Sequence, residues 1–330
     1  MSKPSTLPRG IHRLATFLAG YVVLLITAGG LVKSLEAGLS VPDWPLSYGM
    51  LNPPRWWEIE TVRAEHGHRL IAGVALILTT VLTVWIARRE ERAWVRKLAY
   101  IAMGAVLAQA ALGGITVLFY LPTPISVSHA ALAQAFLVMI VTLAVVTSRF
   151  WLAREKPMSG VDAGRVVSLA TATTGLIYLQ ILVGAVMRHS GAGLAIPDFP
   201  LVFGGLIPPK IDFGIAVHYT HRVGALLVAT LIFWTLGRVL RLAARQPALS
   251  RPAMALTALV LIQGTLGGLV VWTSKAVLPN TLHVGTGALL IGVSVVLTLT
   301  SRRLSWLAER QTLPSEAASV DILGAEQATT

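Results

Sequence analysis

The segment GLSVPDWPL at residues 38–46 recurs as GLAIPDFPL at residues 193–201, 155 positions later. Other matches follow at spacings of 153 to 155 residues. They are Pro53-Pro54 with Pro208-Pro209, His68-Arg69 with His221-Arg222, Gly113-Gly114 with Gly267-Gly268, and His129 with His283. Apolar segments often resemble one another by chance, but a loop, a proline pair and two histidines rarely do so in one register. The sequence therefore predicts an internal duplication.

The composition around these repeats is that of a membrane protein. Of the 330 residues, 55% are apolar and only 13% are charged, and the mean hydropathy is +0.70. A soluble domain carries about 25% charged residues. This composition excludes a cytosolic enzyme and a disordered chain. Because the chain has no cysteine, it also excludes disulfides, thiolate metal sites and covalent haem attachment.

Eight segments have the roughly 20 mostly apolar residues that a membrane span needs. They lie near residues 14–32, 68–87, 98–119, 125–147, 166–187, 216–237, 253–273 and 281–301. Four spans in each repeat make the two halves cross in the same direction, as parallel repeats do. The predicted fold is all-α, with eight transmembrane helices in two four-helix bundles. The predicted boundaries are 1–155 and 156–310, followed by a disordered cytoplasmic tail at 311–330.

The distribution of basic residues predicts the orientation. If both termini share one side, that side holds 19 of the 27 lysines and arginines. The expected location is the plasma membrane. By the positive-inside rule both termini are expected on its cytoplasmic side. The net charge of +12 then reflects topology, so the bilayer is an expected partner and nucleic acid is not. The long loops, near 33–67 and 188–215, are expected outside.

Four histidines occupy equivalent positions near the outer ends of the even-numbered spans: His68 and His129, then His221 and His283. Two histidines at one depth of a bundle can ligate one metal from opposite sides. The spans lack paired carboxylates, and a flat iron macrocycle with two axial imidazoles suits a bundle core. One haem site in each half is the favoured interpretation. A proton or ion pathway and ordinary hydrogen-bonded histidines are the alternatives.

The two halves differ beside these histidines. Glu65 stands one turn before His68, whereas His218 stands one turn before His221. A carboxylate near a haem can relay protons, so chemistry is expected in the first half and electron storage in the second. The alternative is that Glu65 caps its helix or pairs with Arg69. Arg69 and Arg222 are candidate contacts for haem propionates or ordinary interfacial residues.

The chain resembles the haem A synthase family over residues 12–305. The resemblance rests on motifs that include Gly29-Gly30, Gly38-Leu39-Ser40, Trp44-Pro45, Pro53-Pro54, Glu65-His66-Gly67-His68-Arg69, His129, His221-Arg222 and His283. Many bacterial members carry cysteine pairs in the outer loops, and this chain is a cysteine-free variant. Electron delivery through thiols is therefore excluded, and the electron donor is unknown.

The resemblance implies a membrane oxidoreductase that converts a methyl group of haem O to the formyl group of haem A by successive hydroxylation. It implies that His68 and His129 hold the substrate haem, that His221 and His283 ligate a haem b cofactor, and that Glu65 is catalytic. The product would serve haem-copper oxidases, with haem O synthase as a candidate partner. Two other classes are a membrane electron-transfer protein with bis-histidine haem b, linked to quinol, and a transporter built on parallel repeats.

Overall fold

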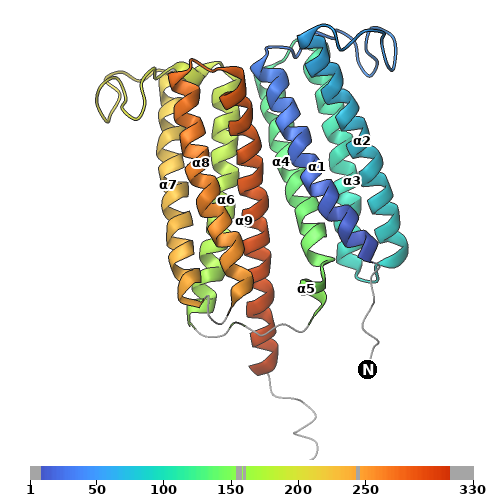
Figure 1. The fold of residues 1–330 in the computed structure, drawn as a ribbon, viewed down its shortest axis with the longest axis vertical. Coiled ribbons are helices and arrows are strands. Elements are labelled where there is room, and N and C mark those ends of the chain that lie inside the picture. Colours follow the sequence, from blue (N-terminus) through green and yellow to red (C-terminus); the bar gives the residue numbers. More distant parts are fainter. Residues whose placement is uncertain (1–8, 154–157, 159–160, 243–245, 313–330) are drawn as a thin grey trace, which may run out of the picture.

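A computed structural model describes residues 9–153, 158, 161–242 and 246–312 (Figure 1). Its long helices are α1 (Arg9–Ser34), α2 (Glu60–Arg89), α3 (Ala93–Leu118), α4 (Thr123–Val146), α6 (Val161–His189), α7 (Phe213–Leu242), α8 (Pro247–Trp272) and α9 (Val277–Thr312). The short helices α5 (Arg149–Leu152) and η1 (Ala192–Leu194) lie in connections. Within these described ranges, eight helices are long and apolar enough to cross a membrane, and no strand is present. The predicted all-α fold with eight spans is confirmed.

The helices extend beyond the predicted apolar segments. Helix α2 has 30 residues, which is about 45 Å of helix, whereas the hydrocarbon layer is about 30 Å thick. Its first turns, which precede His68, therefore extend the helix beyond the predicted apolar segment. Helix α9 continues to Thr312, two residues into the predicted tail. The rest of that tail, 313–330, lies outside the described residues.

The helices form two groups of four, seen side by side in Figure 1. In the first group α1 contacts α2, α2 contacts α3, α3 contacts α4, and α4 contacts α1. The same cycle joins α6, α7, α8 and α9. The long loops 35–59 and 190–212 lie at the same end of the molecule, opposite the end where α1 begins. This arrangement agrees with a pair of parallel repeats.

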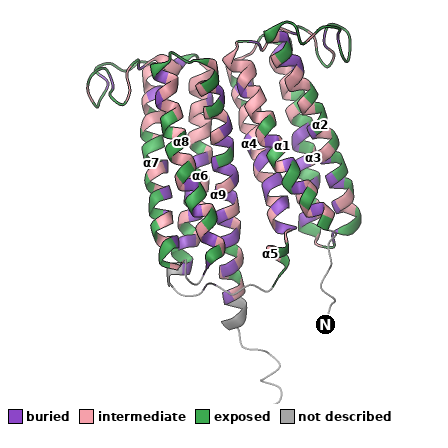
Figure 2. Cartoon of the chain, in the orientation of Figure 1, coloured by how far each residue is buried: buried purple, intermediate pink, exposed green. Residues whose placement is uncertain are grey.

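Helices α4 and α9 lie at the contact between the two groups. Helix α9 contacts both α1 and α4, and α4 also contacts α6. Half of the most apolar window of α9 and 44% of that of α4 is buried, against 22–33% in the other six spanning helices; Figure 2 shows this burial along the bundles. Because lipid is as apolar as the side chains, close packing and polar contacts must hold the groups together.

Arg188 on α6 supplies polar contacts across the two groups. Its Nη2 donates to the Gly30 carbonyl oxygen at 2.7 Å and to Ser34 Oγ at 2.9 Å, both on α1. Its Nη1 donates to Asn280 Oδ1 on α9 at 2.9 Å. The guanidinium therefore ties α1, α6 and α9 together near the loop end of the molecule.

Gly30 allows the close approach of α1 to α9. A Cβ added at Gly30 would lie 3.1 Å from Cβ of Val284. We expect Gly30→Leu to lower the free energy of unfolding by about 1–3 kcal/mol, because overpacking forces the helices apart. Thermal unfolding of the detergent-solubilised protein measures this. Gly73→Leu is the matched control, since nothing lies within 4 Å of a Cβ at Gly73, and it should leave the transition unchanged. Equal midpoints for the two variants would contradict a tight α1–α9 contact.

Candidate functional site

The four predicted histidines lie on alternate helices, and each ring packs against a glycine of the preceding long helix. A Cβ added at that glycine would approach the ring Cε1 to within 2.9–3.3 Å. The pairs are His68 of α2 with Gly29 of α1, His129 of α4 with Gly113 of α3, His221 of α7 with Gly184 of α6, and His283 of α9 with Gly267 of α8. Both halves therefore seat their histidines in the same way, and a larger residue would displace each ring.

The structure brings the second pair together. The ring centres of His221 and His283 are 6.3 Å apart, and the ring planes are inclined at 65°. A metal ion bound to one nitrogen of each ring, through bonds of about 2 Å, holds two imidazole centres about 6 Å apart. The second pair is thus spaced to hold one metal between two rings.

The donor chemistry fits a haem group. The Nδ1 atoms of His68, His129 and His283 are buried and lack a hydrogen-bond partner within the described part of the chain. The same part contains no cluster of three or more His, Cys, Asp or Glu side chains that could hold a metal ion. A small ion would lack ligands here, whereas haem brings four nitrogen ligands and needs only two axial ones. Two histidines in each half could supply these two ligands.

Glu65 and Arg69 hold the first outer loop against the bundle. Glu65 is 3% exposed. Its Oε2 accepts the Val41 N–H at 2.8 Å, and its Oε1 accepts Arg69 Nη2 at 2.7 Å. Arg69 also donates to the carbonyl oxygens of Val41, Asp43 and Leu46 at 2.7–3.0 Å. The pairing of Glu65 with Arg69 that the sequence left open is present, and most Arg69 donors serve loop carbonyls.

The second half repeats this contact without the carboxylate. His218 Nδ1 accepts the Ile196 N–H at 3.2 Å. Arg222 donates to the carbonyl oxygens of Leu201 at 2.8 Å and Ile196 at 3.1 Å. Its Nε is buried and has no partner within the described residues. His218 and Glu65 thus each accept a backbone N–H from the loop, and of these two equivalent contacts only that of Glu65 with Arg69 includes an ion pair.

The Gly-Gly pairs of α3 and α8 serve two neighbours each. The first glycine packs against a histidine, as described above. The second meets a loop aromatic, because a Cβ at Gly114 would lie 2.5 Å from Trp44 and one at Gly268 would lie 2.9 Å from Phe199. The loops therefore cover the bundle ends next to the histidines. In the second half Trp272 Nε1 also donates to the Phe199 carbonyl oxygen at 3.0 Å.

An aspartate organises the turn in each loop. Asp43 accepts the backbone N–H groups of Tyr48 and Gly49, both at 2.7 Å. Asp198 accepts those of Phe203 and Gly204, both at 2.8 Å. In the second loop Phe203 and Gly204 have φ of 52° and 77°. The hydrogen bond from Gly204, followed by that from Phe203, holds the pKa of the Asp198 carboxyl below its ordinary value.

This lowered pKa predicts the acid response of the second loop. A carboxyl group with a depressed pKa in the folded state stabilises that state above its ordinary pKa of about 3.9. The stabilisation is lost as the pH falls through the depressed value. We expect pepsin to cut residues 193–205 slowly at pH 5 and several-fold faster near pH 2, relative to an unstructured peptide of the same sequence. Asp198→Ala should be cut rapidly at both pH values. Equal resistance of both proteins would show that Asp198 does not hold the turn.

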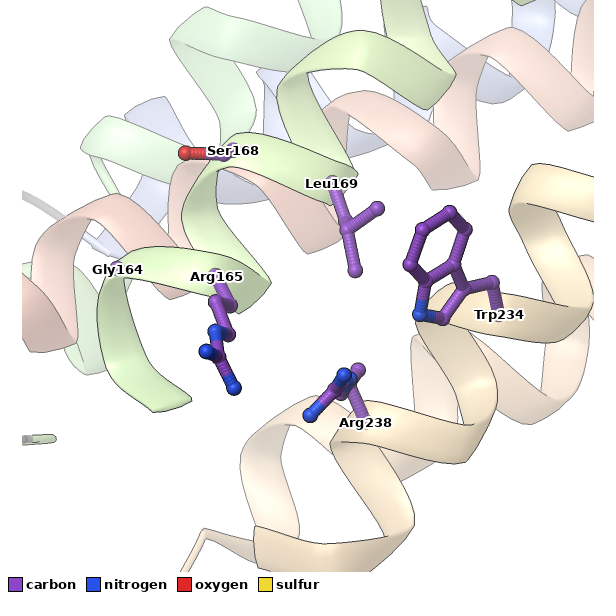
Figure 3. A pocket seen from close by; sticks show the side chains of 6 residues that line it. All are labelled: Gly164, Arg165, Ser168, Leu169, Trp234 and Arg238. Atoms are coloured by element: carbon purple, nitrogen blue, oxygen red, sulfur yellow. The ribbon is translucent and has the colours of Figure 1, made fainter. Parts of the chain in front are cut away.

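A separate hollow lies at the other end of the second group, between the first turns of α6 and the later part of α7 (Figure 3). It is lined by Gly164, Arg165, Ser168, Leu169, Trp234 and Arg238. None of the four histidines lines it, so it is distinct from the candidate haem sites.

Three glutamines beside the histidines were not identified from the sequence. Gln109, Gln180 and Gln263 donate to the backbone carbonyl oxygens of His129, His221 and His283 at 2.9, 2.7 and 3.0 Å. The spacing of 154 residues between Gln109 and Gln263 matches the repeat and is the signal that could have identified two of them.

Comparisons with known proteins agree with this geometry. A family model described as cytochrome oxidase assembly protein matches residues 12–295. The heme A synthase of Shouchella clausii is 30% identical over 239 residues, covering 69% of this chain and 76% of that protein. That of Symbiobacterium thermophilum is 31% identical, covering 68% and 76%. That of Bacillus cereus strain G9842 is 27% identical over 281 residues, covering 83% and 88%. The chain therefore belongs to the haem A synthase family of cytochrome oxidase assembly proteins.

Proposed function

We propose that this protein is a haem A synthase, a membrane oxidoreductase that oxidises a methyl group of haem O to the formyl group of haem A by successive hydroxylation. The observation that carries the proposal is the pair of matched histidine sites, seated alike on glycines, in a chain related to heme A synthases. One site would hold the substrate and the other a resident cofactor. The haem A produced would serve haem-copper oxidases.

The division of labour follows from the differences between the halves. We assign the substrate haem to His68 and His129 in residues 1–155, and a haem b cofactor to His221 and His283 in residues 156–310. Haem b supplies one-electron transfer when bound. The 6.3 Å spacing of the second pair supports a group held between these two rings. The unpartnered Nε of Arg222 leaves one donor for an anionic group such as a haem propionate, and Arg69 is the equivalent candidate in the first half.

Glu65 is the proposed catalytic residue. It precedes His68 by one helical turn, and residues three apart share a helix face. Its carboxylate and Arg69 also hold the loop that covers the first site, which keeps bulk water from that end of the bundle. A carboxylate held beside a substrate haem can accept or return protons during oxidation. The second half, with His218 in register, lacks such a group.

The membrane placement belongs to the proposal as well. Both termini are assigned to the cytoplasm, in a multi-pass protein of the cell membrane, because the basic residues gather on that side. Both histidine pairs then lie toward the outer face. The electron donor is a separate partner, and haem O synthase is the proposed source of substrate.

Expression in a host that makes haem O but not haem A tests the function. Extracted haems are identified by mass spectrometry, with and without the gene, and with His129→Ala as the matched inactive control. We expect haem A, or its hydroxylated intermediate, only with the unaltered protein. If haem O stays unchanged and the purified protein carries bis-histidine haem b, the reaction is not its function in that host.

One observation favours a second candidate, a bis-histidine haem b protein that only transfers electrons. Both oxygens of Glu65 already accept hydrogen bonds from the protein, so this carboxylate has a structural use without any chemistry. An electron-transfer protein would reduce an added acceptor and would leave haem O unchanged. The product analysis above separates the two.

A further inference from the structure

The hollow between α6 and α7 lies at the opposite end of the second group from the histidines. Arg238 follows His221 by 17 residues on α7, which is about 26 Å of helix. The hydrocarbon layer is about 30 Å thick, so a helix with His221 near one edge of the layer places Arg238 near the other. In the proposed orientation this is the cytoplasmic edge. The hollow therefore lies at the level of the lipid headgroups of that leaflet.

The walls of this hollow combine groups that bind phosphate with groups that contact lipid. Its volume is about 600 Å³, which is within the range of ligand pockets. Figure 3 shows the guanidinium groups of Arg165 and Arg238 reaching toward the same opening from α6 and α7. Ser168 adds a hydroxyl group, and Leu169 and Trp234 add apolar surface. Guanidinium groups are preferred partners of phosphate, and tryptophan is enriched where headgroups meet acyl chains.

The first half fills the equivalent corner with side-chain atoms. The spacings of 155 and 153 residues that align the two halves pair Arg165 with Gly10 and Arg238 with Trp85. In the first half the Trp85 ring packs so closely on Gly10 that a Cβ at this glycine would collide with it. The second half replaces the glycine and the tryptophan with two arginines, and a hollow takes the place of the packed ring. The fold itself therefore does not require arginine at these positions.

A smaller hollow with similar side chains lies between α6 and α9. It is lined by Val167, Arg302, Ser305 and Trp306, so arginine, serine and tryptophan occur together a second time at this end of the second group. An ordinary interfacial arginine extends its charge toward water as a single side chain. Two arginines from neighbouring helices that line one hollow, beside a tryptophan, are instead arranged to share an anion. The larger hollow has two arginines and is the stronger candidate.

We propose that the hollow between α6 and α7 binds the phosphate headgroup of an anionic lipid, such as phosphatidylglycerol, from the cytoplasmic leaflet. Arg165 and Arg238 bind the phosphate, and Ser168 donates a hydrogen bond to it. Leu169 and Trp234 contact the adjoining part of the acyl chains. Basic pockets between membrane helices on the cytoplasmic side bind headgroups of this kind. The bound lipid joins the inner ends of α6 and α7. The inference uses the proposed orientation and is independent of the haem chemistry.

Lipid binding by the full-length protein in detergent tests the proposal. Native mass spectrometry measures the bound lipid as phosphatidylglycerol or phosphatidylcholine is titrated. We expect one phosphatidylglycerol to bind about 30-fold more tightly than phosphatidylcholine, because each basic residue near an anionic lipid contributes about fivefold. Arg165→Gln combined with Arg238→Gln should abolish this preference. Arg9→Gln combined with Arg13→Gln is the matched control, since it removes two positive charges from the same end of the first half, and it should keep the preference.

A second double variant separates loss of the site from loss of the fold. Arg165→Gly combined with Arg238→Trp copies the first half, so it should keep the thermal midpoint measured in phosphatidylcholine and lose the preference for phosphatidylglycerol. Millimolar inorganic phosphate, which lacks acyl chains, should not displace the bound lipid. Displacement by phosphate would show a site for free anions and refute the lipid assignment. Equal affinity of the unaltered protein for the two lipids, or loss of the preference in the first-half control, would also overturn the inference.

Discussion

Glu65→His should lower the conversion of haem O by about 10²-fold or more, the contribution of a general acid–base group, and leave bound haem b intact. The substitution copies the second half, where His218 Nδ1 accepts the Ile196 N–H in the place of Glu65 and Val41. A histidine at position 65 can therefore still hold the loop. What it lacks is the carboxylate. Haem A formation in the expression host and the absorption spectrum of purified haem b measure the two effects.

Glu65→Leu is the matched control, because leucine removes the acceptor as well as the carboxylate. In this variant the Val41 N–H and the Arg69 guanidinium lose the carboxylate that accepts their hydrogen bonds. The first outer loop should therefore become sensitive to protease. Glu65→His should keep the resistance of the unaltered protein. If Glu65→His retains conversion while Glu65→Leu loses it, the residue only holds the loop and its catalytic assignment is wrong.

His129→Ala and His283→Ala should have different consequences, and these are the next largest effects. His283→Ala removes one of two rings spaced 6.3 Å apart, so the purified protein should lose its tightly bound haem b and, with it, conversion. His129→Ala should keep haem b at the unaltered stoichiometry and lose conversion. Haem extraction and pyridine haemochrome spectra of both variants, each checked for folding by thermal unfolding, give the comparison. Equal loss of haem b from both would contradict the assignment of substrate and cofactor to separate halves.

The spans were predictable because each helix must present a long apolar surface to lipid. That requirement produces an unbroken apolar run, which sequence alone reveals. The helix ends were not predictable in the same way. Helix α2 begins at Glu60, eight residues before the predicted span, because polar residues continue a helix into the interface. Glu65 therefore lies beyond the first turn and does not cap the helix.

The candidate ligands were predictable because the two halves of a duplicated chain can be aligned with each other. Two histidines repeated in register stand out against apolar helices. Contacts between side chains distant in the chain carry no such signal. Arg188 bonds Gly30 across 158 residues, and in sequence it reads as an ordinary basic helix end. Gln180 has no counterpart in the first half, so the repeat did not mark it. Arg69 could be predicted to act near the site, but its loop carbonyl partners depend on how the loop folds back.

The most direct test of the account uses the purified protein alone. Protein holding haem b is supplied with haem O and a chemical one-electron reductant in air, and the haems are then extracted and identified. The account predicts that haem O becomes the hydroxylated intermediate and then haem A, and that His129→Ala abolishes this while its haem b is still reduced. If haem b is reduced and reoxidised through many cycles while bound haem O stays unchanged, the protein is an electron-transfer protein and the central claim is wrong.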